Sequence, residues 1–149
     1  MEDYTLNGAY DRRAVVLVVT LSSFLTPFSA SSFNIALPSI GREFALDAVT
    51  LSWAALAFLL AAAMFLVPLG RLADIHGRKR VFTVGLATNT SAALLLAVYP
   101  SRLTLIPLRT LQGVGNAMIF GTGIAILMSV FSEREKGAIL GINVASVYL

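Results

Sequence analysis

Arg109 is the only charged residue between positions 103 and 132 of this chain. Gln112, Gly113 and Asn116 follow it at i+3, i+4 and i+7, so a helix would place these side chains on one face. If that helix spans a membrane, inserting the charged side chain costs about 2.5–3.5 kcal/mol. An arginine in such a position is a candidate functional residue. The spacing therefore predicts a polar face, built around a guanidinium and two amides, inside an apolar helix.

This pattern is compatible with two positions of the Arg109 side chain. In the first, the guanidinium lies in a water-filled cavity that the polar face lines. In the second, the guanidinium extends outward to the lipid headgroups while its carbon stem stays in the membrane. Gln112 and Asn116 lie deeper on the same face, and this favours the cavity. Gly113 adds a gap in side-chain bulk there.

Polar residues in the first apolar stretch are candidates for the same cavity. Thr26, Ser29 and Asn34 lie within an uncharged run that extends from 14 to 41. Hydroxyl and amide groups in membrane helices also bond to their own backbone or to a neighbouring helix. Both interpretations remain open for these three residues.

A second group of candidate residues lies in the segment GRLADIHGRKRV, from Gly70 to Val81. Gly70 permits a close backbone approach, and Gly77 permits a positive φ in a tight turn. Asp74 can accept hydrogen bonds from free amides at a helix start. Arg78 and Lys79 carry charges that suit an anionic membrane surface. Composition alone indicates a tight turn between two helices.

The composition indicates that lipid surrounds most of this chain. Hydrophobic residues make up 57% and charged residues 13% of its 149 residues, against roughly 25% charged in a soluble domain. A membrane helix needs about 20 apolar residues, and four uncharged runs reach that length. We predict an all-α, polytopic transmembrane helix bundle after a cytoplasmic tail of residues 1–13. The predicted transmembrane domain, 14–149, has helices at about 14–40, 50–72, 79–98 and 103–131, and an incomplete fifth from 136.

The end of the chain interrupts the fifth apolar run at Leu149. We therefore expect a fragment of a larger protein, with a complete small membrane protein as the alternative. Arg12 and Arg13 before the first apolar run resemble the start of a signal peptide. Because that run is longer than a signal peptide requires, we expect an uncleaved first helix.

The basic residues predict the orientation of the helices. Eight of them lie in the tail, between the second and third helices or after the fourth, whereas two, Arg42 and Arg102, lie in the opposite connections. By the positive-inside rule, the N-terminus is cytoplasmic. We expect a multi-pass protein of the cell (plasma) membrane. The orientation of the helices in the membrane explains where the basic residues lie. We therefore expect lipid as a partner and no nucleic acid.

Two sequence patterns resemble those of the major facilitator superfamily. Gly70-x-Leu72-Ala73-Asp74-x-x-Gly77-Arg78-Lys79 resembles its signature between helices two and three, and Arg109-x-x-Gln112-Gly113-x-Gly115 resembles its helix-four signature. Asn34-Ile35-Ala36-Leu37-Pro38 and Trp53 further resemble the drug:proton antiporter branch with 14 helices. The resemblance covers about residues 14–149 and corresponds to the N-terminal part of such a fold.

The resemblance implies an exporter of drugs or small molecules that works by alternating access. It implies a cytoplasmic gate that contains Gly70, Asp74, Gly77, Arg78 and Lys79. It also implies a translocation path lined by Arg109, Gln112, Gly113, Asn116, Asn34 and Ser29. The remaining helices of the transporter, a small-molecule substrate and protons are the implied partners.

The chain departs from the antiporter branch at positions that matter for proton coupling. Ile75 replaces a commonly basic residue, and Ser29 stands where the branch commonly has an aspartate. The fifth-helix signature would lie beyond Leu149. All eight acidic residues are in the tail or in predicted loops: Glu2, Asp3, Asp11, Glu43, Asp47, Asp74, Glu133 and Glu135. This segment therefore offers no proton carrier inside the membrane.

Two alternatives to an exporter remain, and the sequence argues against an enzyme. A uniporter or metabolite carrier of the same superfamily is one alternative, and a small membrane protein that modulates a partner transporter is another. The chain has no cysteine and one histidine, His76, and no cluster of nucleophile, base and orienting group. We therefore expect no enzyme activity, no cofactor and no metal site.

Overall fold

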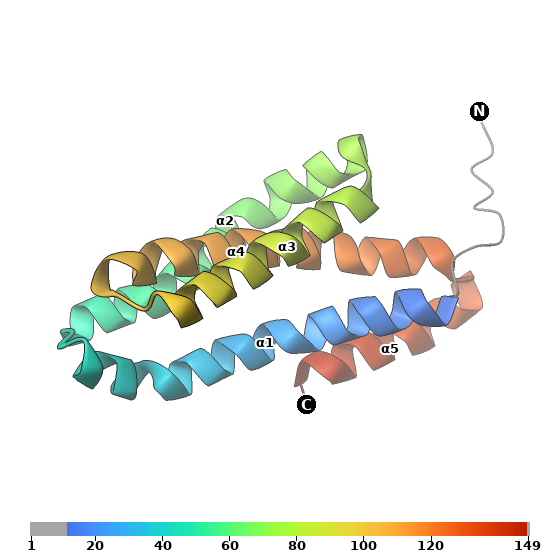
Figure 1. Cartoon of the computed structure of the whole chain (residues 1–149). Coiled ribbons are helices and arrows are strands. Elements are labelled where there is room, and N and C mark those ends of the chain that lie inside the picture. The colour runs from blue at the N-terminus through green and yellow to red at the C-terminus, as the bar shows by residue number, and fades with distance from the viewer. Residues whose placement is uncertain (1–11, 149) are drawn as a thin grey trace.

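The computed structural model describes residues 12–148, and these residues form five helices and no strand (Figure 1). The helices are α1 (Arg12–Glu43), α2 (Ala48–His76), α3 (Arg78–Val98), α4 (Arg102–Val130) and α5 (Glu133–Tyr148). The first four are long and apolar enough to cross a membrane. The prediction of an all-α transmembrane bundle is confirmed for the described residues; the tail at 1–11 lies outside them.

The helices extend further than their uncharged runs. α2 continues to His76 instead of ending near residue 72, so Asp74 lies in a helix and not in a loop. Gly77 alone connects α2 to α3, with φ at 96°. A charge stops the apolar pattern but not the backbone hydrogen bonds, and therefore these helices extend past their apolar segments. α1 likewise continues through Pro27 and Pro38 to Glu43.

α4 occupies the centre of the arrangement. It packs most extensively against α2 and α3, and less against α1, while α5 folds back beside α1 (Figure 1). Of the 18-residue apolar segment of α4, 44% is buried, against 22% for each of the other three membrane-length helices. The connections α1–α2 and α3–α4 lie at one end, and the connections α2–α3 and α4–α5 lie at the other (Figure 1).

Glycines allow α4 to approach both of its main partners. A Cβ atom on Gly113 would collide with the Phe58 carbonyl oxygen of α2. A Cβ on Gly115 would lie 2.8 Å from the Asn89 nitrogen and 2.9 Å from the Gly85 oxygen, both in α3. Because small side chains let membrane helices pack backbone to backbone, these two glycines seat α4 between α2 and α3.

Candidate translocation site around Arg109

Arg109 lies inside the helix bundle, with 3% of its surface exposed. Its guanidinium carbon is 3.9 Å from the ring centre of Phe33 in α1 and 4.5 Å from the ring centre of Phe58 in α2. An aromatic face attracts a cation within about 6 Å, and more strongly when water is excluded. Three helices thus meet at this one side chain.

Two hydrogen bonds hold the guanidinium of Arg109 in place. Nη1 donates to Gln112 Oε1 at 3.0 Å, one turn further along α4, and Nε donates to the Ala54 carbonyl oxygen of α2 at 3.4 Å. Gln112 is itself buried. The i and i+3 spacing predicted that Arg109 and Gln112 share a face, and here they bond directly.

The other predicted residues of the α4 face have different environments. Gly113 lies in the tight contact with α2. Asn116 is half-buried, and its buried Oδ1 accepts no hydrogen bond from the residues that the structure describes. Asn116 is therefore a polar group inside the bundle whose partner the described chain does not supply.

The three candidate polar residues of α1 have different environments. Thr26 is buried, and its hydroxyl donates to the Ser22 carbonyl oxygen at 3.0 Å. Ser29 is half-buried, and Asn34 is exposed. Among the described residues, the hydrogen bonds of Arg109 go to Gln112 and Ala54 and not to Ser29 or Asn34. Its ring contact in α1 is with Phe33.

A polar contact also joins α1 to α5. Asn143 Nδ2 donates to Ser23 Oγ at 2.9 Å, and both side chains are buried. Sequence reasoning did not select Asn143, Phe33 or Phe58. Nothing in the spacing of these three residues distinguishes them from their neighbours, and only the packing of the helices shows what they touch.

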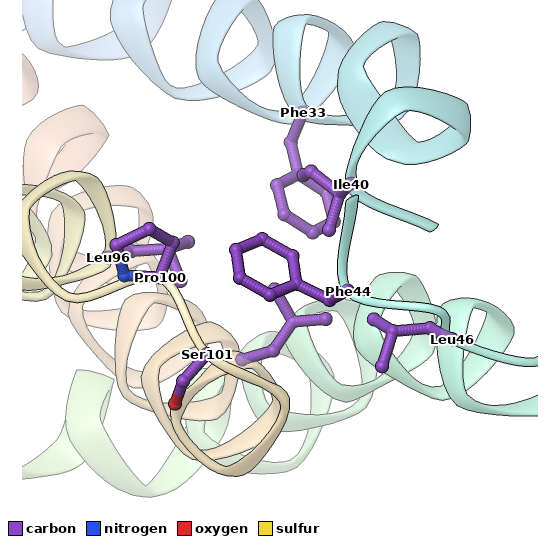
Figure 2. Close-up of a pocket in the computed structure, with 8 residues that line it drawn as sticks. Phe33, Ile40, Phe44, Leu46, Leu96, Pro100 and Ser101 are labelled. Carbon is purple, nitrogen blue, oxygen red and sulfur yellow. The ribbon is translucent and has the colours of Figure 1, made fainter. Parts of the chain in front are cut away.

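A small apolar cavity lies at the end of the bundle that contains the α1–α2 and α3–α4 connections. Its volume is about 80 Å³. Figure 2 shows the Phe33, Ile40 and Phe44 side chains directed into it, opposite Leu96 and Pro100. Leu105, one turn before Arg109 in α4, also lines it. Phe33 therefore touches Arg109 and this cavity.

Asp74 and Arg78 link three helices at the opposite end. Asp74 Oδ1 is 3.0 Å from Arg78 Nε and also 3.0 Å from Arg78 Nη2, across the turn at Gly77. Arg78 Nη1 donates to the Ala125 carbonyl oxygen of α4 at 3.3 Å. The Asp74 carboxylate thus binds a side chain, whereas the sequence had suggested free amides at a helix start as its partners.

The remaining residues of this segment have simpler roles. Gly77 has the positive φ expected of a glycine turn. A Cβ on Gly70 would meet nothing within 4 Å, so Gly70 does not need to be glycine for reasons of space. Lys79 is exposed in the first turn of α3.

A carboxylate in the connection between α1 and α2 has a shifted pKa. A hydrogen bond from the Thr50 hydroxyl lowers the pKa of Asp47, which precedes α2. Among the residues that the structure describes, no group of three potential metal ligands occurs.

Comparison with protein families decides what this helix arrangement is. The family model of the Major Facilitator Superfamily matches residues 19–149. The chain belongs to the major facilitator superfamily. As a member of that superfamily it is a multi-pass membrane protein, and the superfamily consists of transporters.

Curated relatives in the superfamily have several activities in their names. The chain is 38% identical over 123 residues to the cephamycin export protein CmcT of Amycolatopsis lactamdurans, covering 83% of this chain and 25% of that protein. It is 34% identical over 144 residues to the puromycin resistance protein pur8 of Streptomyces alboniger (95% and 29%). It is 29% identical over 133 residues to the riboflavin transporter RibZ of Clostridioides difficile (89% and 29%). The chain spans less than a third of the length of each.

Proposed function

We propose that this chain forms the first membrane helices of a secondary active transporter that exports drugs or small molecules by alternating access. The observation that carries the proposal is Arg109, a buried cation at the meeting point of α1, α2 and α4. A charge in that position is costly and is retained where it contacts a substrate or an ion. Superfamily transporters bind their substrates near the bilayer midplane.

Export and the substrate class are proposed from the relatives. Two of the three relatives named above have export or resistance in their names. The riboflavin transporter supports the second candidate, a metabolite carrier of the same superfamily. An assay that follows both directions of movement separates the two candidates.

Proton coupling requires a group that gains and loses a proton within the membrane. Between residues 12 and 148, each acidic residue lies at a helix end or in a connection: Glu43, Asp47, Asp74, Glu133 and Glu135. Arginine stays protonated in proteins and is therefore no proton carrier itself. A proton-coupled mechanism needs a carboxylate from elsewhere in the transporter, with Arg109 responding to its charge.

The proposed gate lies at the Asp74–Arg78 end of the bundle. Basic residues flank the Gly77 turn and lie in the first turn of α5. By the positive-inside rule, they support a cytoplasmic position for this end of a plasma-membrane protein. The contact of Arg78 with Asp74 and with α4 holds three helices together. Opening toward the cytoplasm requires these contacts to rearrange.

Drug accumulation in cells that express the complete open reading frame containing this chain tests the function. The host lacks its own efflux pumps, and the panel includes cationic, neutral and anionic antibiotics. We expect expression to lower the accumulation of at least one compound, and Arg109→Ala to abolish the effect. Arg102→Ala, in the exposed first turn of the same helix, is the matched control.

An uncoupler and a crosslinking experiment separate the proton antiporter from the two alternatives, a carrier and a modulator of a partner transporter. If collapsing the proton gradient leaves flux unchanged, the protein is not a proton antiporter, and this favours the uniporter or metabolite carrier. If the panel and candidate metabolites show no flux, while crosslinking recovers one specific transporter, the chain is a modulator of that partner.

A further inference from the structure

Arg109 has a buried positive charge without a counter-ion among the described residues. No described carboxylate forms an ion pair with it, and its two hydrogen bonds go to an amide and a backbone carbonyl. Buried charges in proteins are normally paired, because an unpaired one keeps its full desolvation cost. Within the part of the chain that the structure describes, the site therefore has no negative group.

The free donors of Arg109 lie in the plane of its guanidinium. The rings of Phe33 and Phe58 lie close to the guanidinium carbon, and an aromatic ring offers the N–H groups no oxygen or nitrogen acceptor. Of the three guanidinium nitrogens, Nε and Nη1 have acceptors among the described residues. Carboxylates bind arginine in this plane, through parallel hydrogen bonds.

Asn116 supplies a second unfilled position on the same face. Its Oδ1 is buried and accepts no hydrogen bond within the described chain. Arg109 lies against Phe33, and a Cβ on Gly123 would lie 3.2 Å from Val19, so Asn116 is halfway between two contacts that fix the register of α4 against α1. Midway between Val19 and Phe33 along α1 is Thr26, whose hydroxyl already donates to its own helix.

The two positions are separated by a definite length. Seven residues of α-helix correspond to about 10 Å. Asn116 is the middle residue of α4, which extends from Arg102 to Val130, so it lies at the depth where superfamily transporters bind substrate. The two aromatic rings beside Arg109 offer apolar contacts for the body of a molecule.

We propose that this face binds an amphipathic organic anion, with a carboxylate at Arg109 and an N–H or O–H group at Asn116. This inference rests on the proposed transport function and adds the class of substrate to it. An acidic side chain from the part of the protein outside this chain would offer Arg109 the same chemistry. The test must therefore distinguish a carboxylate of the ligand from one of the protein.

Three related probes make that distinction. They are 6-hydroxy-2-naphthoate, its neutral amide 6-hydroxy-2-naphthamide, and 2-naphthoate, which lacks the hydroxyl. Binding to the full-length protein in nanodiscs is followed by probe fluorescence. We expect the hydroxynaphthoate to bind about tenfold or more tightly than the amide, as a charge-assisted hydrogen bond requires. We also expect it to bind more tightly than 2-naphthoate.

Variants assign each preference to a residue. Arg109→Gln should remove the preference for the acid over the amide, and Arg109→Lys, which keeps a charge, should retain part of it. Asn116→Ala should remove the preference for the hydroxyl and leave the acid preference intact, which keeps the test decisive if Arg109→Gln does not fold. Arg102→Gln should leave both preferences unchanged.

Equal binding of acid and amide by the wild-type protein would overturn the inference and assign the counter-ion of Arg109 to the protein itself. An acid preference that survives in Arg109→Gln would overturn it as well. Neither result touches the transport function, which fails separately if no compound is moved by the full-length protein. Arg109-dependent transport of cations without any acid preference would preserve the function and reject the inference.

Discussion

The ring of Phe33 in α1 lies against the guanidinium of Arg109 in α4, 3.9 Å from ring centre to Cζ. This contact joins the helix that packs with α5 to the helix that forms the centre of the bundle. It also places Phe33 between the charge and the apolar cavity at the α1–α2 end. Motion of α1 relative to α4 must therefore break or remake a contact with the buried cation.

Replacing Phe33 with leucine should impair transport by the full-length protein. Leucine keeps the apolar volume of the site but has no aromatic face, and a cation–π contact is worth about 0.5–2 kcal/mol. We expect a loss of several-fold in the initial rate of export. Phe33→Tyr keeps the ring and should stay near the wild-type rate. A wild-type export rate in Phe33→Leu would exclude the contact between Phe33 and Arg109 from the mechanism.

Gly113→Ala should destabilise the bundle, whereas Gly121→Ala should not. The new methyl group at 113 would collide with the Phe58 carbonyl oxygen, and at 121 it would lie 3.5 Å from its nearest neighbour. Overpacking typically costs about 1–3 kcal/mol. Thermal unfolding of the purified full-length variants measures the difference. Equal melting temperatures for both variants would contradict the close approach of α2 and α4.

The Asp74–Arg78 pair should affect transport more than stability. Both side chains are largely exposed, at 61% and 44%, and an exposed ion pair contributes about 0–1 kcal/mol. We expect Asp74→Asn to reduce export strongly while the melting temperature changes little. Exchanging the two residues restores an ion pair but loses the Arg78 bond to Ala125, so the double variant should recover only part of the rate. Full activity of Asp74→Asn would rule out a role in gating.

Cysteine labelling tests the orientation that the basic residues predict. The chain has no cysteine of its own, and Ile75 and Tyr99 are exposed at 77% and 67%, at opposite ends of the bundle. In intact cells, a membrane-impermeant maleimide should label Tyr99→Cys and not Ile75→Cys, in a full-length background without other reactive cysteines. The reverse pattern would place the N-terminus outside.

The sequence predicted the features that depend on one helix at a time. The number of membrane-length helices follows from the uncharged runs, and the Arg109–Gln112 contact follows from helical spacing. The helix ends were less predictable, because α2 continues as a helix past Arg71 and Asp74 until Gly77 forces a turn. Charge marks the edge of the apolar segment, and this is not the edge of the helix.

Features that depend on two helices were not accessible from the sequence. Nothing in the spacing of α1 or α2 shows that Phe33 and Phe58 face Arg109, because the register between helices is set by the close contacts of Gly113, Gly115 and their partners. For the same reason the sequence could not choose among the polar residues of α1. Packing of α4 against its neighbours decides which side chains reach the guanidinium.

The role of Arg109 in transport is tested by the initial rate of substrate export in proteoliposomes. The rate is compared among the full-length wild type, Arg109→Ala and Arg102→Ala. A substrate identified in the accumulation assay is used at equal amounts of folded protein. We expect the initial rate to fall at least tenfold in Arg109→Ala and to stay near the wild-type value in Arg102→Ala. Wild-type flux in Arg109→Ala would contradict this expectation, because the buried guanidinium between α1, α2 and α4 would then have no part in transport.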